Sequence, residues 1–142
     1  MRALLDVNVL IALLDAAHIH HLRARAWMEA NITQGWASCP ITQNGCIRIL
    51  SSPAYPGQQA PGQIAARLAE ATGTKWHEFW PDAVSLLDHD WVNWGQVLGS
   101  RQVTDVYLLA LAKYHGGRLV TLDRSVPLAA VPGVTAEHLA NI

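Results

Sequence analysis

Apolar residues form two kinds of run along the chain, and the two kinds alternate. Short apolar runs of about four to eight residues are typical of buried strands, whereas longer segments with helical spacing are typical of helices. The pattern predicts strands at residues 2–5, 35–39, 76–80 and 118–122, and a weaker fifth strand at 133–136. It predicts helices at residues 7–16, 20–32, 40–50, 63–71, 91–98 and 103–115.

This alternation of strand and helix favours an α/β fold, a three-layer α/β/α sandwich around a central parallel sheet. The segment at residues 51–62 is rich in proline and glycine and is predicted to be a loop, too short to link two domains. A chain of 142 residues is long enough to bury one sizeable core. We therefore expect a single domain spanning residues 1–142.

Composition and charge narrow the classes of function. Hydrophobic residues make up 51% of the chain and charged residues 15%, which is typical of a well-packed globular protein. The formal net charge of −1 excludes a broadly basic surface, so any contact with nucleic acid must be local. Asp6 and Asn8 interrupt the first apolar run, which is too short for a membrane helix. With Cys39 and Cys46 expected to be free thiols, the sequence predicts a cytoplasmic protein with no membrane partner.

Three acidic residues occupy related places in the predicted fold. Asp6 follows the first strand, Asp123 follows the strand at 118–122, and Asp105 begins the helix that leads into that strand. Sites in open α/β sheets form at the carboxyl ends of strands, so these carboxylates are expected to converge. Each one alone is also explained as a helix cap or a turn residue. Together they would repel one another unless a cation such as Mg²⁺ or Mn²⁺ lay between them.

A carboxylate cluster of this kind suits the hydrolysis of phosphate esters, by a nuclease or by a phosphatase. A phosphatase with an aspartate nucleophile would usually have a second aspartate two residues after the first, where this chain has Asn8. Asn8 could hydrogen-bond Asp6 or a ligand, or it could cap the first helix. The sequence has no dinucleotide-binding glycine motif, no P-loop and no nucleophile elbow.

Four segments in order resemble the PIN domain, specifically the VapC-type toxins of bacterial toxin–antitoxin pairs. They are LLDVNVL at 4–10, CPITQNGCIRIL at 39–50, QVTDVYLLALA at 102–112 and LVTLDR at 119–124. The resemblance implies an endoribonuclease that depends on Mg²⁺ or Mn²⁺ and acts on tRNA or rRNA. It also implies a homodimer and a cognate antitoxin whose tail fills the active groove.

The resemblance also assigns roles to residues. Asp6, Asp105 and Asp123 resemble the metal ligands and water-activating carboxylates, and Thr104 resembles a hydroxyl that supports them. The chain departs from the pattern at Gln43, where many relatives have glutamate as a fourth acidic residue. Glutamine removes a negative charge, so the metal affinity should fall. The alternative is therefore a weakened or silent module that binds RNA or a partner protein without cutting RNA.

Three arginines lie close in sequence to these motifs. Arg48, Arg101 and Arg124 are candidates to hold RNA phosphates, with Arg124 favoured because it is next to Asp123. Solvent-exposed arginines with no such role are the ordinary alternative.

Two further groups of residues have ordinary explanations. The histidines at 18, 20 and 21 are expected in a solvated loop rather than a metal site. The six tryptophans are expected in the core or at a dimer interface more than as platforms for stacked bases.

Overall fold

The computed structural model describes residues 1–142 and contains one five-stranded sheet. All neighbouring strands are parallel, and their order across the sheet is β3-β2-β1-β4-β5. The strands are β1 (Ala3–Leu5), β2 (Trp36–Ser38), β3 (His77–Phe79), β4 (Arg118–Thr121) and β5 (Leu139–Asn141).

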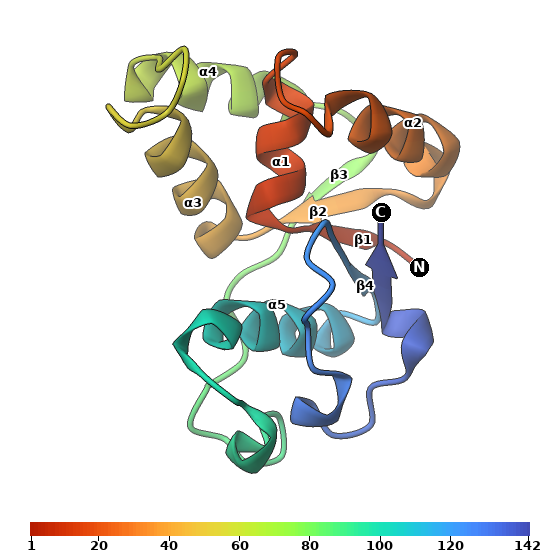
Figure 1. The fold of residues 1–142 in the computed structure, drawn as a ribbon. Helices are drawn as coiled ribbons and strands as arrows, with labels where there is room; N and C mark the ends of the chain where they lie inside the picture. The colour runs from red at the N-terminus through yellow and green to blue at the C-terminus, as the bar shows by residue number, and fades with distance from the viewer.

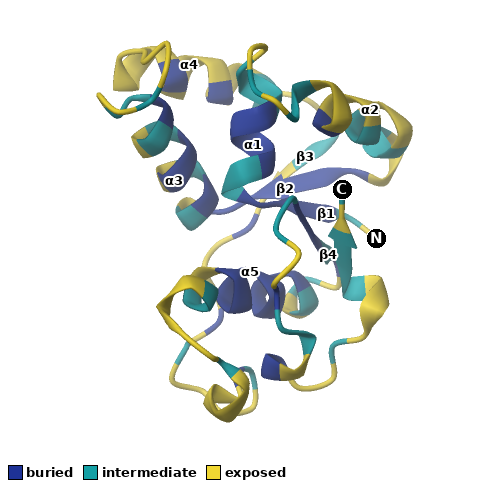
Figure 2. Ribbon diagram, in the orientation of Figure 1, coloured by how far each residue is buried: buried dark blue, intermediate teal, exposed yellow.

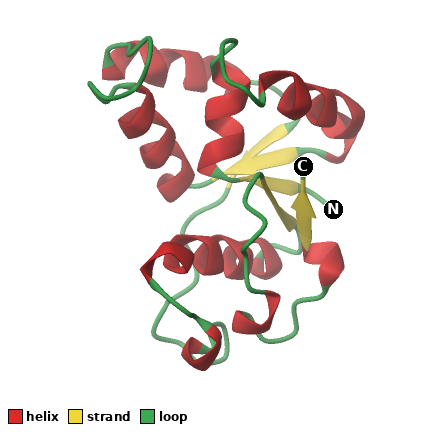
Figure 3. Cartoon of the chain, viewed as in Figure 1, coloured by secondary structure: helices red, strands yellow, loops and turns green.

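Helices cover both faces of this sheet, which confirms the predicted three-layer α/β/α arrangement (Figures 1 and 3). The helices α1 to α4 lie on one side, and α5 lies on the other (Figure 1). They are α1 (Val7–Leu14), α2 (His21–Asn31), α3 (Pro40–Leu50), α4 (Pro61–Thr72) and α5 (Val103–Tyr114). No helix is long and apolar enough to cross a membrane.

The apolar core is divided in two by the sheet. Ala3 and Leu5 of β1 belong to the cluster that includes α1, whereas Leu4 belongs to the cluster that includes α5. Successive residues of a strand point to opposite faces, so three consecutive apolar residues are what a strand covered on both faces requires. Figure 2 shows the resulting layer of buried residues along the sheet, α1 and α5.

The order of the strands decides where the acidic residues meet. β1 lies between β2 and β4, and Leu5 pairs with Val120 of β4. The Asp6 N–H donates to the Val120 carbonyl at 2.9 Å, which continues this pairing one residue past β1. The segments that leave β1 and β4 therefore start side by side at the carboxyl edge of the sheet, where ligands bind in open α/β folds.

Two predicted elements are wrong. The helix expected at 91–98 is reduced to a 3-10 turn at Trp94–Gln96, because Asn93 is extended and caps the start of the turn and Val97 is extended at its end. The strand expected at 133–136 is absent because Gly133 adopts a positive φ of 76° and turns the chain. The fifth strand is β5 instead, and its Leu139 pairs with Leu119.

Candidate active site

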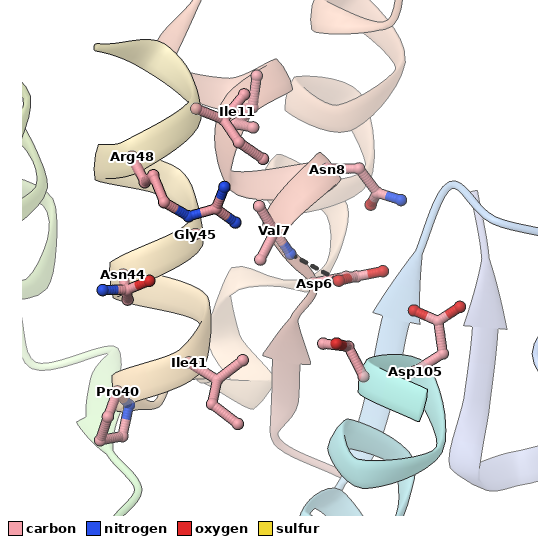
Figure 4. A pocket seen from close by; sticks show the side chains of 12 residues that line it. Asp6, Val7, Asn8, Ile11, Pro40, Ile41, Asn44, Gly45, Arg48 and Asp105 are labelled. Carbon is pink, nitrogen blue, oxygen red and sulfur yellow. Dashed lines mark hydrogen bonds between the residues drawn. The ribbon is translucent and has the colours of Figure 1, made fainter. Parts of the chain in front are cut away.

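A cavity of about 590 Å³ opens at the carboxyl edge of the sheet, between α1, α3 and the start of α5. Figure 4 shows the carboxylates of Asp6 and Asp105 at one end of it and Arg48 reaching from α3. Gly45 lets the two helices meet closely, because a Cβ there would lie 2.7 Å from a methyl group of Val7. The residues that line the cavity are Asp6, Val7, Asn8, Ile11, Pro40, Ile41, Asn44, Gly45, Arg48, Ile49, Thr104 and Asp105.

Asp6 is fixed by hydrogen bonds to both of its carboxylate oxygens. The Thr121 hydroxyl donates to Oδ2 at 2.6 Å, and the Val7 N–H donates to Oδ1 at 2.7 Å. Asp6 is also the N-cap residue of α1, so the capping explanation and the predicted placement at the sheet edge both hold. Its side chain is almost fully buried, and such a carboxylate is stable there only with these partners or a cation.

Thr121 connects three of the polar groups at this edge. Its hydroxyl donates to Asp6, and it accepts from the Asn8 side-chain amide at 3.3 Å and from the Asp123 N–H at 3.0 Å. A hydroxyl has one donor and two acceptor sites, so Thr121 uses all of them. Asn8 completes the link by accepting from the Leu122 N–H at 3.2 Å.

Sequence reasoning missed Thr121 and named Thr104 as the supporting hydroxyl. Thr104 is exposed and lines the cavity, but it makes no side-chain hydrogen bond to a carboxylate. A signal for Thr121 was present, since it is a polar residue that directly follows the apolar pair Leu119 and Val120 in β4 and lies two positions before Asp123. A buried hydroxyl in such a strand needs hydrogen-bond partners, and here one of those partners is Asp6.

Asp123 lies next to the cavity and does not line it. Its Oδ1 accepts from the Ser125 N–H at 2.8 Å and from the Ser125 hydroxyl at 2.7 Å. These hydrogen bonds lower the pKa of Asp123, so this carboxylate stays charged. Asp105 is within hydrogen-bonding reach of it.

The three carboxylates influence one another. Burial, followed by the negative charges of Asp6 and Asp123, raises the pKa of Asp105 to about 7. Burial also raises the pKa of Asp6, although the Thr121 hydrogen bond opposes the shift. Aspartate has a pKa near 4 in water, so without a cation Asp105 keeps a proton for part of the time near neutral pH. The structure therefore brings Asp6 and Asp105 into one cavity, with Asp123 beside Asp105.

The residues fit a hydrated divalent ion better than a closed metal cage. No three His, Cys, Asp or Glu side chains are grouped closely enough to enclose one ion. Mg²⁺ usually keeps several water ligands and binds one or two carboxylates, and Asp6 and Asp105 supply two in the same cavity. Their oxygen donors, their shared burial and their mutual repulsion all suit such an ion.

The helix α3 contributes Asn44 to the cavity instead of Gln43, which corrects the expectation from the sequence. The Gln43 side chain donates to the Ser38 hydroxyl at 3.0 Å, and that hydroxyl also contacts His77 at 2.8 Å. Gln43 lines a separate hollow beside α4. Successive residues of a helix point about 100° apart, so a motif read by position alone can assign the wrong neighbour to the site.

Only one of the three candidate arginines lines the cavity. Arg48 lies on α3 one turn after Asn44, is exposed and forms no ion pair. Arg101 and Arg124 are also exposed but line none of the hollows around the cavity. Arg124 was favoured because it is next to Asp123 in the sequence, but it does not line the cavity.

The histidines, tryptophans and cysteines considered in the sequence analysis lie outside the cavity. The His21 ring contacts the Ala12 carbonyl at 2.7 Å, and the histidines around it form no metal group. Trp36 and Trp80 are buried in the core, whereas Trp94 is 44% exposed. Both cysteines are free and buried.

The comparisons with known proteins agree with this geometry. The family model described as PIN domain matches residues 3–133. The ribonuclease VapC44 of Mycobacterium tuberculosis is 54% identical over 142 residues, which is all of both chains. The ribonuclease VapC38 of the same organism is 44% identical over 125 residues, covering 87% of this chain and 86% of VapC38. The chain therefore belongs to the PIN domain family and, within it, to the VapC toxins.

Solved structures share the fold at low sequence identity. VapC20 of Mycobacterium tuberculosis, a toxin that cleaves the sarcin–ricin loop, has a TM-score of 0.60 at 12% identity, covering 84% of this chain and 87% of VapC20. VapBC2 of Rickettsia felis, solved with a DNA fragment from its promoter, has a TM-score of 0.63 at 15% identity. The match covers 99% of this chain and 98% of the VapBC2 chain. These two matches confirm the α/β/α architecture.

Proposed function

We propose that this chain is a single-domain endoribonuclease whose activity depends on Mg²⁺ or Mn²⁺ and that acts as the toxin of a toxin–antitoxin pair. The observation that supports it most is the meeting of Asp6 and Asp105 in one cavity with Asp123 beside them. The 54% identity to a ribonuclease over the whole chain points to the same activity.

The protein groups have distinct roles in this proposal. Asp6, held by Thr121 and Val7, and Asp105, on the first turn of α5, are the two ligands within the cavity. Asp123 keeps its charge through Ser125 and adds negative potential from the side. When bound, the ion supplies Lewis acidity that activates water and neutralises charge on the scissile phosphate.

The partners follow from the family. A cognate antitoxin protein, a structured RNA of the tRNA or rRNA class, a homodimeric state and action in the cytoplasm are all part of the proposal. The net charge of −1 makes a local binding surface necessary for RNA, and Arg48 is the cation at the cavity.

The silent-module alternative loses its main argument in this structure. That alternative relied on Gln43 as a neutral residue in the metal site, and Gln43 contacts Ser38 outside the cavity. We therefore retain the ribonuclease as the proposed function.

An RNA cleavage assay tests the proposal. Purified protein is incubated with total tRNA and rRNA in Mg²⁺, Mn²⁺ or EDTA, beside Asp105→Asn and a matched control, Asp90→Asn. Asp90 is exposed and far in sequence from the site residues, and its one ion-pair contact is with His89 at 3.8 Å. We expect metal-dependent cuts from the wild type and from Asp90→Asn, and none from Asp105→Asn. Equal cutting by all three proteins, or cutting in EDTA, would contradict the proposal.

A further inference from the structure

The cavity at the carboxylates continues as a series of hollows along α3. A second hollow of about 260 Å³ shares Arg48 and Ile49 with the cavity and adds Ser52, Ala54 and Tyr55. A third, of about 370 Å³, shares Tyr55 with the second and ends at Arg67 of α4. The second hollow therefore borders both the cavity and the third hollow, and the series runs from Asp6 at the start of α1 to Leu14 at its end. We refer to this series as the α3 groove.

Two positive charges lie along the α3 groove without an acidic partner. Arg48 forms no ion pair, and neither does Arg67. Arg67 donates to the Leu14 carbonyl and to the Gln59 side-chain oxygen, so its guanidinium is positioned but its charge is not neutralised. Guanidinium groups held in this way are well suited to bind phosphates.

An aromatic ring lies between these two arginines. Tyr55 comes from the proline-rich loop, and its hydroxyl donates to the Asp15 carboxylate at the end of α1. That carboxylate also accepts from the Ala17 N–H at 3.0 Å, so the one acidic group in the third hollow already has two donors. An anchored ring between cations is the arrangement on which single-stranded nucleic acids stack a base.

We infer that the α3 groove binds the single-stranded part of an RNA substrate that leads away from the carboxylates, with phosphates at Arg48 and Arg67 and a base stacked on Tyr55. This inference rests on the proposed ribonuclease function and adds the path of the RNA. Arg48 and Arg67 line these hollows and Arg101 and Arg124 do not, so we assign the strand to the α3 side.

Fluorescence anisotropy with random-sequence RNA pools of 4 and 12 nucleotides tests this path. The proteins are prepared in the Asp105→Asn background so that the RNA stays intact, with Mg²⁺ present. The variants are Tyr55→Ala, Tyr55→Phe, Arg48→Gln and Arg67→Gln. The matched control is Arg23→Gln, because Arg23 is an exposed residue of α2 that lines none of the three hollows.

We expect the 12-nucleotide pool to bind more tightly than the 4-nucleotide pool. Tyr55→Ala should weaken binding of the longer pool by about tenfold, and Tyr55→Phe should restore most of it because the ring remains. Arg48→Gln and Arg67→Gln should each lower the slope of log affinity against log salt by about 0.7. Arg23→Gln should change neither quantity.

Equal binding of both pools, or unchanged salt slopes in both arginine variants, would overturn the inference. The same result would follow if the groove served a protein partner instead of RNA. If the wild type still cleaves RNA with metal in that case, the proposed function stands and only the path is wrong. If the wild type cleaves no RNA with metal, the proposed function itself fails.

Discussion

The two walls of the cavity differ in how their polar groups are held. The wall next to the sheet, here called the sheet wall, consists of Asp6 directly after β1 and Asn8 in the first turn of α1. Both side chains are hydrogen-bonded to Thr121, which is buried in β4. On the helix wall, Asn44 and Arg48 of α3 are exposed and make no side-chain hydrogen bond or ion pair within the protein. One wall is fixed before any ligand arrives, and the other is left with free donors.

This difference assigns different tasks to the two walls. Groups that hold a metal ion need fixed positions, and the partners behind them are often nearly as important as the ligands themselves. Groups that contact the backbone of a nucleic acid need hydrogen-bond donors that are not already used within the protein. Changes on the sheet wall should therefore abolish the reaction, whereas changes on the helix wall should alter affinity.

The largest expected effect comes from the buried carboxylate of the sheet wall. Asp6→Asn removes one of the two charged ligands in the cavity but leaves an oxygen that can still accept from Thr121. We expect the rate of RNA cleavage to fall by more than about 100-fold, because metal catalysis depends on the bound ion. Initial rates under single-turnover conditions measure this, and a variant within a few-fold of the wild type would contradict the assignment.

The next effect should come from the residue behind that carboxylate. Thr121→Val keeps the shape of the side chain but removes the donor to Asp6 and the acceptor for Asn8 and the Asp123 N–H. Loss of such a supporting partner costs about 10- to 100-fold in metal affinity or activity. Thr121→Ser keeps the hydroxyl and should recover most of the loss. Equal defects in both variants, with both proteins folded, would show that the hydroxyl is not what matters.

Two substitutions on α3 compare Asn44, which lines the cavity, with its neighbour Gln43, which does not. Asn44→Glu adds a carboxylate to the lining, so the Mn²⁺ dissociation constant should fall by about tenfold, since affinity rises with ligand charge. Gln43→Glu adds the same charge beside Ser38 and should leave Mn²⁺ affinity nearly unchanged. Calorimetric titration of both proteins measures this. Tighter Mn²⁺ binding by Gln43→Glu alone would place residue 43 in the metal site, as the sequence analysis expected.

The smallest effect concerns stability without metal. Asp105 has a pKa of about 7 in the folded protein and near 4 unfolded, so the folded state binds more protons between those values. The free energy of unfolding therefore decreases as pH rises from about 4 to 7. Asp105→Asn removes this loss, and its Tm in EDTA at pH 8 should exceed that of the wild type by a few degrees. At pH 4 the difference should be much smaller. Parallel Tm curves against pH would contradict the raised pKa.

The sequence predicted the sheet edge better than the helix wall, for a physical reason. The apolar run at residues 3–5 shows where the first strand ends, and Asp6 and Asp105 both lie at the cavity on that carboxyl edge. On α3, one residue rotates a side chain by about 100°, so Asn44 and Gln43 were exchanged. Thr121 was missed because its role depends on a partner 115 positions away in the chain.

A Mn²⁺ titration followed by electron paramagnetic resonance of the free ion tests the central claim most directly. The account predicts saturable binding by the wild type and by Asp90→Asn, and weak or absent binding by Asp6→Asn and Asp105→Asn. Absence of binding by the wild type, or equal binding by all four proteins, would contradict a metal centre built on these two carboxylates.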